Sequence, residues 1–108
     1  MKIDPVRRYE SSDDFFNLDG SVTMKVSADA AIAICERAID HGLFISRIEG
    51  GFWHSPGFEA RLDSIWDGAN MPVDRKAATK NNHAAAEFVR SERVLHDVFI
   101  ITSERITG

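Results

Sequence analysis

One short segment holds three carboxylates, Glu59, Asp63 and Asp67, together with Arg61, and paired carboxylates can carry out acid–base chemistry. The segment 58–66, FEARLDSIW, alternates apolar and charged residues with the period of a strand, so these four side chains are expected on one face. Two carboxylates on one face can act as general acid and general base if burial separates their pKa values. One interpretation is a small enzyme that uses Asp63, Asp67 and His54 in a cleft on a sheet, and the other is a solvated sheet face.

Other reactive side chains lack the partners that catalysis or metal binding needs. His54 and Ser55 are adjacent, and adjacent residues rarely face each other as a base and a nucleophile must. His83 and Glu87 are four residues apart and share a face of an expected helix, but they supply only half of a metal site. Cys35 lies among apolar residues and is expected to be a buried thiol. We therefore predict no catalytic residues, no metal and no cofactor.

Aromatic residues concentrate in the segment 47–68, RIEGGFWHSPGFEARLDSIWDG, which holds both tryptophans of the chain. Phe52, Trp53 and His54 stand between a glycine pair and a Ser-Pro-Gly turn, so we expect them at the long, exposed tip of a hairpin. Protein interfaces are enriched in aromatic residues and arginine and have a charged rim. The predicted partner-binding residues are Phe52, Trp53, His54, Glu59, Arg61, Asp63 and Asp67.

The net charge of the chain indicates which class of macromolecule it can bind, nucleic acid or a basic protein. Its 108 residues include 13 Lys and Arg and 17 Asp and Glu, a formal net charge of −4. Residues 9–19 contribute four acids and no base. Proteins that bind DNA or RNA need a cationic surface that releases counterions from the phosphates, so this balance argues against nucleic acid and favours a cationic protein as partner.

Length and hydropathy predict a single folded domain over residues 1–108. A hydrophobic content of 44% is typical of globular proteins. The apolar runs are far shorter than the roughly 18 residues of a membrane span, and the N-terminal residues MKIDPVRRYESSDD lack the apolar region of a secretory signal. Because a single cysteine also fits a reducing compartment, we expect a cytoplasmic protein that does not bind membranes.

The elements that would position these residues are helices and strands in mixed order. Residues 27–42, SADAAIAICERAIDHG, predict a helix with Ser27 as N-cap and Gly42 beyond its end. Strands are expected at LFISRIE, FEARLDSIW and a central VFII, with a further one at SVTMKV, and a second helix near NHAAAEFVRSE capped by Asn81 or Asn82. The predicted fold class is α+β: a small, mainly antiparallel sheet with two main helices packed on one face.

The apolar periodicity of these elements predicts one core between helix and sheet. Ile32 and Ile39 share the apolar stripe of the helix 27–42, and Ile34 lies off that stripe. Trp66 is expected in the core because it is in phase with Leu62. The residues expected to be buried together are Ile32, Cys35, Ile39, Leu62, Val98 and Ile100.

A small, acidic α+β chain without catalytic residues resembles the immunity proteins of bacterial toxin systems. The resemblance rests on the size, charge and layout of the whole chain, together with RIEGGFWHSPGFEARLDSIWDG and the closing FIITSERITG. It implies a stoichiometric inhibitor of a cognate toxin, whose acidic face occupies the toxin's cationic active site or its surroundings. Aromatic anchors would supply the affinity and charge the association rate. A homodimeric regulatory subunit is the other non-enzymatic alternative.

Overall fold

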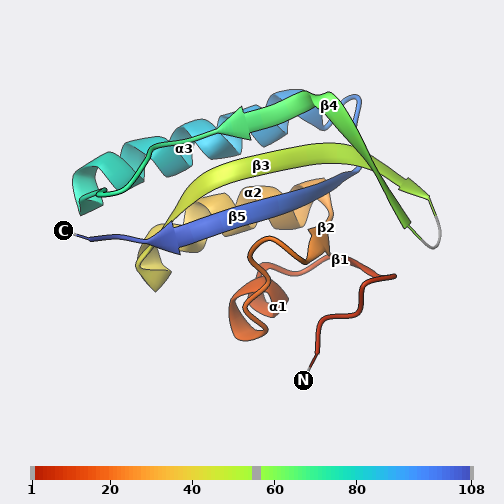
Figure 1. Ribbon diagram of the computed structural model, residues 1–108, viewed down its shortest axis with the longest axis horizontal. Helices are drawn as coiled ribbons and strands as arrows, with labels where there is room; N and C mark the ends of the chain where they lie inside the picture. The colour runs from red at the N-terminus through yellow and green to blue at the C-terminus, as the bar shows by residue number, and fades with distance from the viewer. Residues whose placement is uncertain (1, 55–56, 108) are drawn as a thin grey trace.

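A five-stranded sheet with two long helices on one face forms the body of the protein (Figure 1). The computed structural model describes residues 2–54 and 57–107, apart from the side chains of Leu62 and Asp63. In chain order its elements are β1 (Arg8–Tyr9), α1 (Ser12–Asn17), β2 (Lys25–Val26), α2 (Ala28–Arg37), the 3₁₀ helix η1 (Ala38–His41), β3 (Leu43–His54), β4 (Gly57–Asp67), α3 (Arg75–Glu92) and β5 (Val98–Arg105). The strand order is β1-β2-β5-β3-β4, and only the β1–β2 pair is parallel. The predicted α+β fold class is confirmed.

The central strands are β3 and β5, which pair with each other and each with one further strand. Because opposite residues share a face, the pairs that Ile48 makes with Ile101 and Trp66 place these three side chains on the side of α2 and α3. Trp66 packs against the main core cluster, as expected, although the side chain of Leu62, on whose phase that expectation rested, lies outside the described residues. The central position expected for VFII is also confirmed.

Helix α2 begins and ends where its capping residues predict. The Ser27 hydroxyl accepts a hydrogen bond from the amide of Ala30 at 3.2 Å, which satisfies one free donor of the first turn. The helix tightens into η1 and stops at Gly42, whose φ of 71° is the left-handed conformation that glycine adopts without strain. The chain then enters β3 directly at Leu43.

The buried face of α2 is rotated from the predicted one. Ile34, expected off the apolar stripe, is fully buried, whereas Ile32 and Ile39 are only half-buried. The small side chains of Ala30 and Ala31 face the core together with Ile34, and they let the helix approach its neighbours closely. Ala28, Ala31, Cys35 and Ala38, which have the spacing of the same stripe as Ile32 and Ile39, are all buried, so the core face is only shifted toward Ala30 and Ile34.

The predicted core residues of β5 belong to the other face of the sheet. Ile100 pairs with Glu49, and Val98 with Gly51, so both lie opposite to the face that α2 and α3 cover. Ile100 is accordingly half-buried, while Phe99 and Ile101 enter the main cluster. Of the residues expected to be buried together, Cys35 and Val98 are buried but on different sides of the sheet, and the side chain of Leu62 lies outside the described residues.

Helix α3 begins earlier than the sequence predicted, and the two asparagines expected to cap it lie in its interior. The N-cap is Asp74, whose Oδ1 accepts from the amide of Ala77 at 2.8 Å. Asp74 follows the loop residues Met71 and Pro72 and has the same capping chemistry as asparagine. The helix therefore takes up residues that were expected to form a loop, and Asn81 and Asn82 are free for another role.

Asn81 and Asn82 complete the hydrogen bonding of β3 where β4 does not reach. Leu43 and Ile45 pair with β5 on one side, but pairing between β3 and β4 starts only at Arg47, so no strand lies beside them on the other side. Asn82 accepts from the Ile45 amide at 2.9 Å and donates to the Leu43 carbonyl at 3.1 Å, while Asn81 donates to the Ile45 carbonyl at 2.7 Å. These amides fasten α3 to the sheet and satisfy buried backbone groups.

Replacing Asn82 by alanine is expected to lower the free energy of unfolding by about 2 kcal/mol or more. The substitution leaves the Ile45 amide and the Leu43 carbonyl without partners, and an unsatisfied buried polar group costs roughly 1–3 kcal/mol. Urea denaturation followed by far-UV circular dichroism measures the loss. The control is His83→Ala on the exposed side of the same helix; equal losses in the two variants would contradict the role of Asn82.

Candidate functional site

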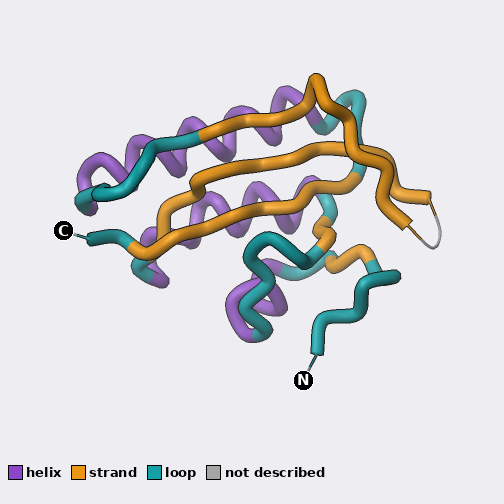
Figure 2. Tube along the Cα trace, viewed as in Figure 1, coloured by secondary structure: helices purple, strands orange, loops and turns teal. Residues whose placement is uncertain are grey.

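The β3–β4 hairpin extends beyond the rest of the sheet as a two-stranded arm, defined here as residues 52–54 of β3 and 57–61 of β4. Gly51 is the last β3 residue paired with β5, and Phe52, Trp53 and His54 pair with β4 alone. Figure 2 shows the two strands continuing past the point where β5 starts. The hairpin is confirmed, but the long aromatic tip is wrong, because these aromatic residues lie in paired strands. The turn residues 55 and 56 lie outside the described residues.

One face of the arm, on the side of α3, brings together four of the predicted site residues. Phe52 is paired with Glu59, and the Arg61 guanidinium carbon lies 5.0 Å from the centre of the Phe52 ring. Glu59 accepts from Arg61 Nη1 at 3.4 Å, and its other oxygen lies 3.2 Å from His54 Nε2. The three charged side chains are 43–65% exposed, so their ion pairs add little stability and the groups stay accessible to a partner.

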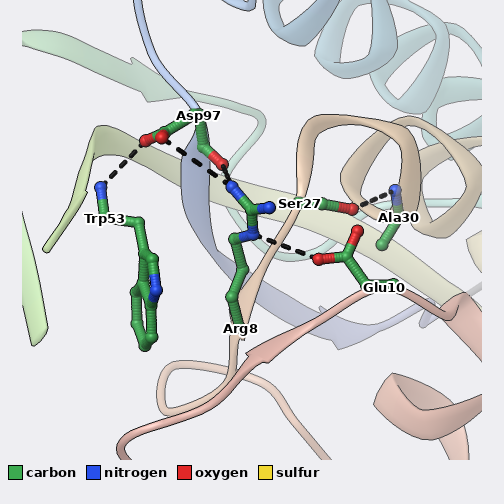
Figure 3. A network of polar contacts seen from close by, with 6 residues as sticks. All are labelled: Arg8, Glu10, Ser27, Ala30, Trp53 and Asp97. Atoms are coloured by element: carbon green, nitrogen blue, oxygen red, sulfur yellow. Dashed lines mark hydrogen bonds and ion pairs between the residues drawn. The ribbon is translucent and has the colours of Figure 1, made fainter. Parts of the chain in front are cut away.

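Trp53 lies on the opposite face of the arm, where it is paired with Phe58. Both side chains are half-buried in the free protein. The Trp53 amide donates a hydrogen bond to Asp97 Oδ1 at 2.8 Å, which joins the arm to the residue before β5 (Figure 3). An aromatic residue thus stands on each side of a narrow element.

The structure does not bring Asp67 to the arm. Asp67 is paired with Arg47, whose Nη1 lies 3.0 Å from its carboxylate, and Arg47 is five β3 residues from Phe52, about 17 Å along the strand. The side chain of Asp63 lies outside the described residues. The predicted set therefore divides between the arm and the distant end of β4.

An irregularity in β4 explains why the predicted alternation fails. Between the pairs Glu49–Ile65 and Gly51–Ala60, β3 advances two residues and β4 five, so β4 carries three extra residues opposite Gly50. An odd number of extra residues reverses the phase of a strand, which puts Glu59 and Asp67 on opposite faces. The expectation that residues 59, 61, 63 and 67 share one face is wrong.

Two exposed aliphatic residues beside the arm were not among the site residues predicted from the sequence. Val94 is 79% exposed and Leu95 66% exposed, directly after α3. With Phe52 and the buried imidazole of His96 they line a shallow hollow of about 210 Å³, which Arg93 and Asp97 also border. Adjacent aliphatic residues in a polar helix-to-strand connection were the available signal, because exposed apolar patches often mark interaction surfaces.

The described residues offer little for catalysis. Within 2–54 and 57–107, no three His, Cys, Asp or Glu side chains are placed to hold a metal ion. Burial raises the pKa of the Cys35 thiol to about 12, so the reactive thiolate is scarce at neutral pH. In the same part of the chain, no helix combines the length and apolar character needed to cross a bilayer.

Comparison with known proteins identifies the family. Residues 24–103 match the family model described as Colicin-E5 Imm protein. The chain is 68% identical over 108 residues to Immunity protein CdiI of Burkholderia pseudomallei, covering 100% of this chain and 99% of that protein. Colicin-E5 immunity protein in ColE9 and Colicin-E5 immunity protein, both of Escherichia coli, are 38% and 37% identical over 81 residues, in each case covering 73% of this chain and 96% of the relative.

These matches confirm the resemblance to immunity proteins and overturn the alternative of a small enzyme that uses Asp63, Asp67 and His54. The chain belongs to the colicin-E5 immunity protein family: it neutralises a cognate bacterial toxin by binding it, and it is not an enzyme.

Proposed function

We propose that the toxin is bound by the arm together with Val94 and Leu95. The observation that carries the proposal is the position of the aromatic residues: Phe52 and Trp53 sit on a paired, two-stranded element beyond the end of β5. The hollow formed with Val94 and Leu95 lies next to Phe52, so apolar contact area continues from the arm to the body. Rigid aromatic anchors surrounded by accessible charges are typical of the residues that dominate binding energy.

The polar part of this proposed surface consists of His54 and the charged residues Glu59, Arg61 and Asp63, while Asp67 is left out because it is paired with Arg47 at the other end of β4. His54, Glu59 and Arg61 already contact one another in the free protein. A toxin that approaches the arm would therefore exchange existing, solvent-exposed ion pairs for new ones. Such exchange contributes more to specificity and to the association rate than to affinity.

We further propose that the toxin presents a cationic surface and that one immunity chain binds one toxin in the cytoplasm, without nucleic acid or membrane. The support is the net charge of −4, which attracts a basic partner over long distances. The acidic run 9–19 contributes less than its composition suggests, because Asp13 pairs with Arg37 and Glu10 with Arg8. A homodimer is the alternative, and light scattering of the free chain and of the complex distinguishes the two.

Replacing Glu59 by glutamine is expected to slow association with the toxin about twofold to fivefold at low salt. The substitution removes one negative charge from the arm, and the effect should shrink above 0.1 M salt, where the screening length falls below about 10 Å. Stopped-flow mixing with the toxin co-purified from the native host measures the rate. Dissociation should change less than association, because Glu59 is about half exposed.

A matched variant tests whether the toxin docks elsewhere. A second hollow of about 430 Å³ lies away from the arm and is lined by the acids Asp19 and Glu104, among others. Glu104→Gln removes the same charge as Glu59→Gln, but at that second location. If Glu104→Gln slows association and Glu59→Gln does not, the arm is not the binding surface and the larger hollow takes its place.

A further inference from the structure

The N-terminal residues 2–23 lie outside the family match, which begins at residue 24. They add β1 and α1 to the matched body. β1 runs parallel to β2, with Arg8 opposite Lys25 and Tyr9 opposite Val26, and the Tyr9 carbonyl accepts from the Ser27 amide at 2.9 Å. The Tyr9 side chain is only 3% exposed. This segment is therefore fastened to the body by strand pairing and by burial.

Asp97 fixes β3 at the point where the arm begins. Its amide donates to the Gly51 carbonyl at 3.2 Å, and its carboxylate accepts from the Trp53 amide at 2.8 Å. Since β5 starts only at Val98, the side chain of Asp97 takes the place that a further β5 residue would occupy beside Trp53. The Asp97 carboxylate therefore contacts β3 within the first residues of the arm.

Arg8 of the N-terminal segment holds Asp97 in place. Arg8 Nη1 donates to the Asp97 carbonyl at 3.0 Å and lies 3.8 Å from the other carboxylate oxygen of Asp97. Arg8 Nε donates to Glu10 Oε2 at 3.1 Å, which orients the guanidinium from the opposite side (Figure 3). A planar guanidinium with acceptors on two of its edges has little freedom to turn. Figure 3 shows the resulting chain of contacts from Glu10 through Arg8 and Asp97 to Trp53.

We propose that Arg8 is a positioning residue for toxin binding. Through Asp97 it sets the orientation of the arm, so that Trp53 already has its bound conformation before the toxin arrives. Residues that are held in the bound geometry before association lose less entropy on binding, which slows dissociation of the complex. The N-terminal segment thus supplies a contact to the arm that residues 24–103 alone do not contain. This inference rests on the proposed function of the arm.

The test compares Arg8→Ala with Arg7→Ala in the full-length chain. Both variants lose one positive charge from neighbouring positions, but Arg7 lies beside Asp14 at 4.0 Å and over the Tyr9 ring, away from Asp97. We expect Arg8→Ala to dissociate from the toxin about tenfold faster and Arg7→Ala to dissociate at nearly the wild-type rate. Both should unfold near the wild-type urea midpoint, because the ion pairs they remove are exposed.

Two further measurements separate positioning from a general structural role. Hydrogen exchange at the Trp53 amide should accelerate in Arg8→Ala but not in Arg7→Ala, and Arg8→Lys should restore part of both the protection and the slow dissociation. The double variant Arg8→Ala, Asp97→Ala should dissociate no faster than Asp97→Ala alone, because both residues act through one contact. Additive effects would show that Arg8 acts on the toxin by a separate route and would overturn the proposal.

Failure of the inference and failure of the proposed function have different outcomes. If Trp53→Ala binds the toxin like the wild-type chain, the arm is not the binding surface and both proposals fall. If Trp53→Ala binds weakly while Arg8→Ala dissociates and exchanges like the wild-type chain, only the role of Arg8 is overturned. If Arg7→Ala matches Arg8→Ala in dissociation rate, the effect comes from charge or from the stability of the segment, and the positioning role is again overturned.

Discussion

Replacing Trp53 by alanine is expected to weaken the complex with the toxin by about 2 kcal/mol or more while the fold stays intact. The reason is the place of Trp53 in the free protein: it is half-buried, it is paired only with Phe58 of the arm, and it lies outside both clusters of the core. The part of this large aromatic side chain that remains exposed is available for burial against a partner. Isothermal titration calorimetry with the purified toxin gives the binding free energy.

The other tryptophan provides the matched control. Trp66 is opposite Ile48 and packs against the main core cluster, so Trp66→Ala should lower the urea midpoint and change toxin affinity mainly through loss of folded protein. Trp53→Ala should show the reverse pattern, with an unchanged midpoint and weak binding. A Trp53→Ala chain that unfolds as easily as Trp66→Ala would show that Trp53 is a core residue, and the proposed surface would lose its main anchor.

The features that the sequence predicted correctly depend on local chemistry. Ser27 and Gly42 define the ends of the first long helix because capping needs only a hydroxyl near a free amide and a residue that tolerates positive φ. The hairpin between β3 and β4 follows from two apolar segments separated by turn residues. These signals act over a few residues, so they can be recognised in the sequence without knowledge of the rest of the chain.

The features that the sequence did not predict depend on distant partners. The three extra residues of β4 become visible only in the pairing with β3, and they place Trp66 and Asp67 on the faces opposite to those that a regular strand continuing from Glu59 would give them. Asn81 and Asn82 were interpreted as caps, but the edge of β3 that β4 does not cover determines their role. The contact of Arg8 with Asp97 joins residues 89 positions apart. The arm was therefore predictable as a hairpin, whereas the division of its residues between two faces was not.

The second prediction with a large expected effect concerns the stability of the core. Ile34→Ala is expected to lower the free energy of unfolding by about 2–5 kcal/mol, the range for removing a fully buried aliphatic side chain. Ile34 has no exposed surface and packs in the main cluster between α2, α3 and the sheet, where a cavity cannot be filled by solvent or by movement of a surface side chain. Urea denaturation of the free protein, with the fitted slope compared between variants, measures the loss.

Two neighbouring isoleucines determine whether the observed helix orientation is correct. Ile32 and Ile39 are half-buried, so truncating either to alanine should cost less than truncating Ile34, although the same atoms are removed each time. The periodicity of bulky residues alone predicts the opposite order, with Ile39→Ala as the most damaging change. If Ile39→Ala destabilises the protein more than Ile34→Ala, α2 presents its isoleucine stripe to the core and the face formed by Ala30, Ala31 and Ile34 does not. If Ile34→Ala is the costliest, the alanines set the orientation of the helix, because only small side chains allow it to approach the sheet and α3 closely enough to enclose Ile34 completely.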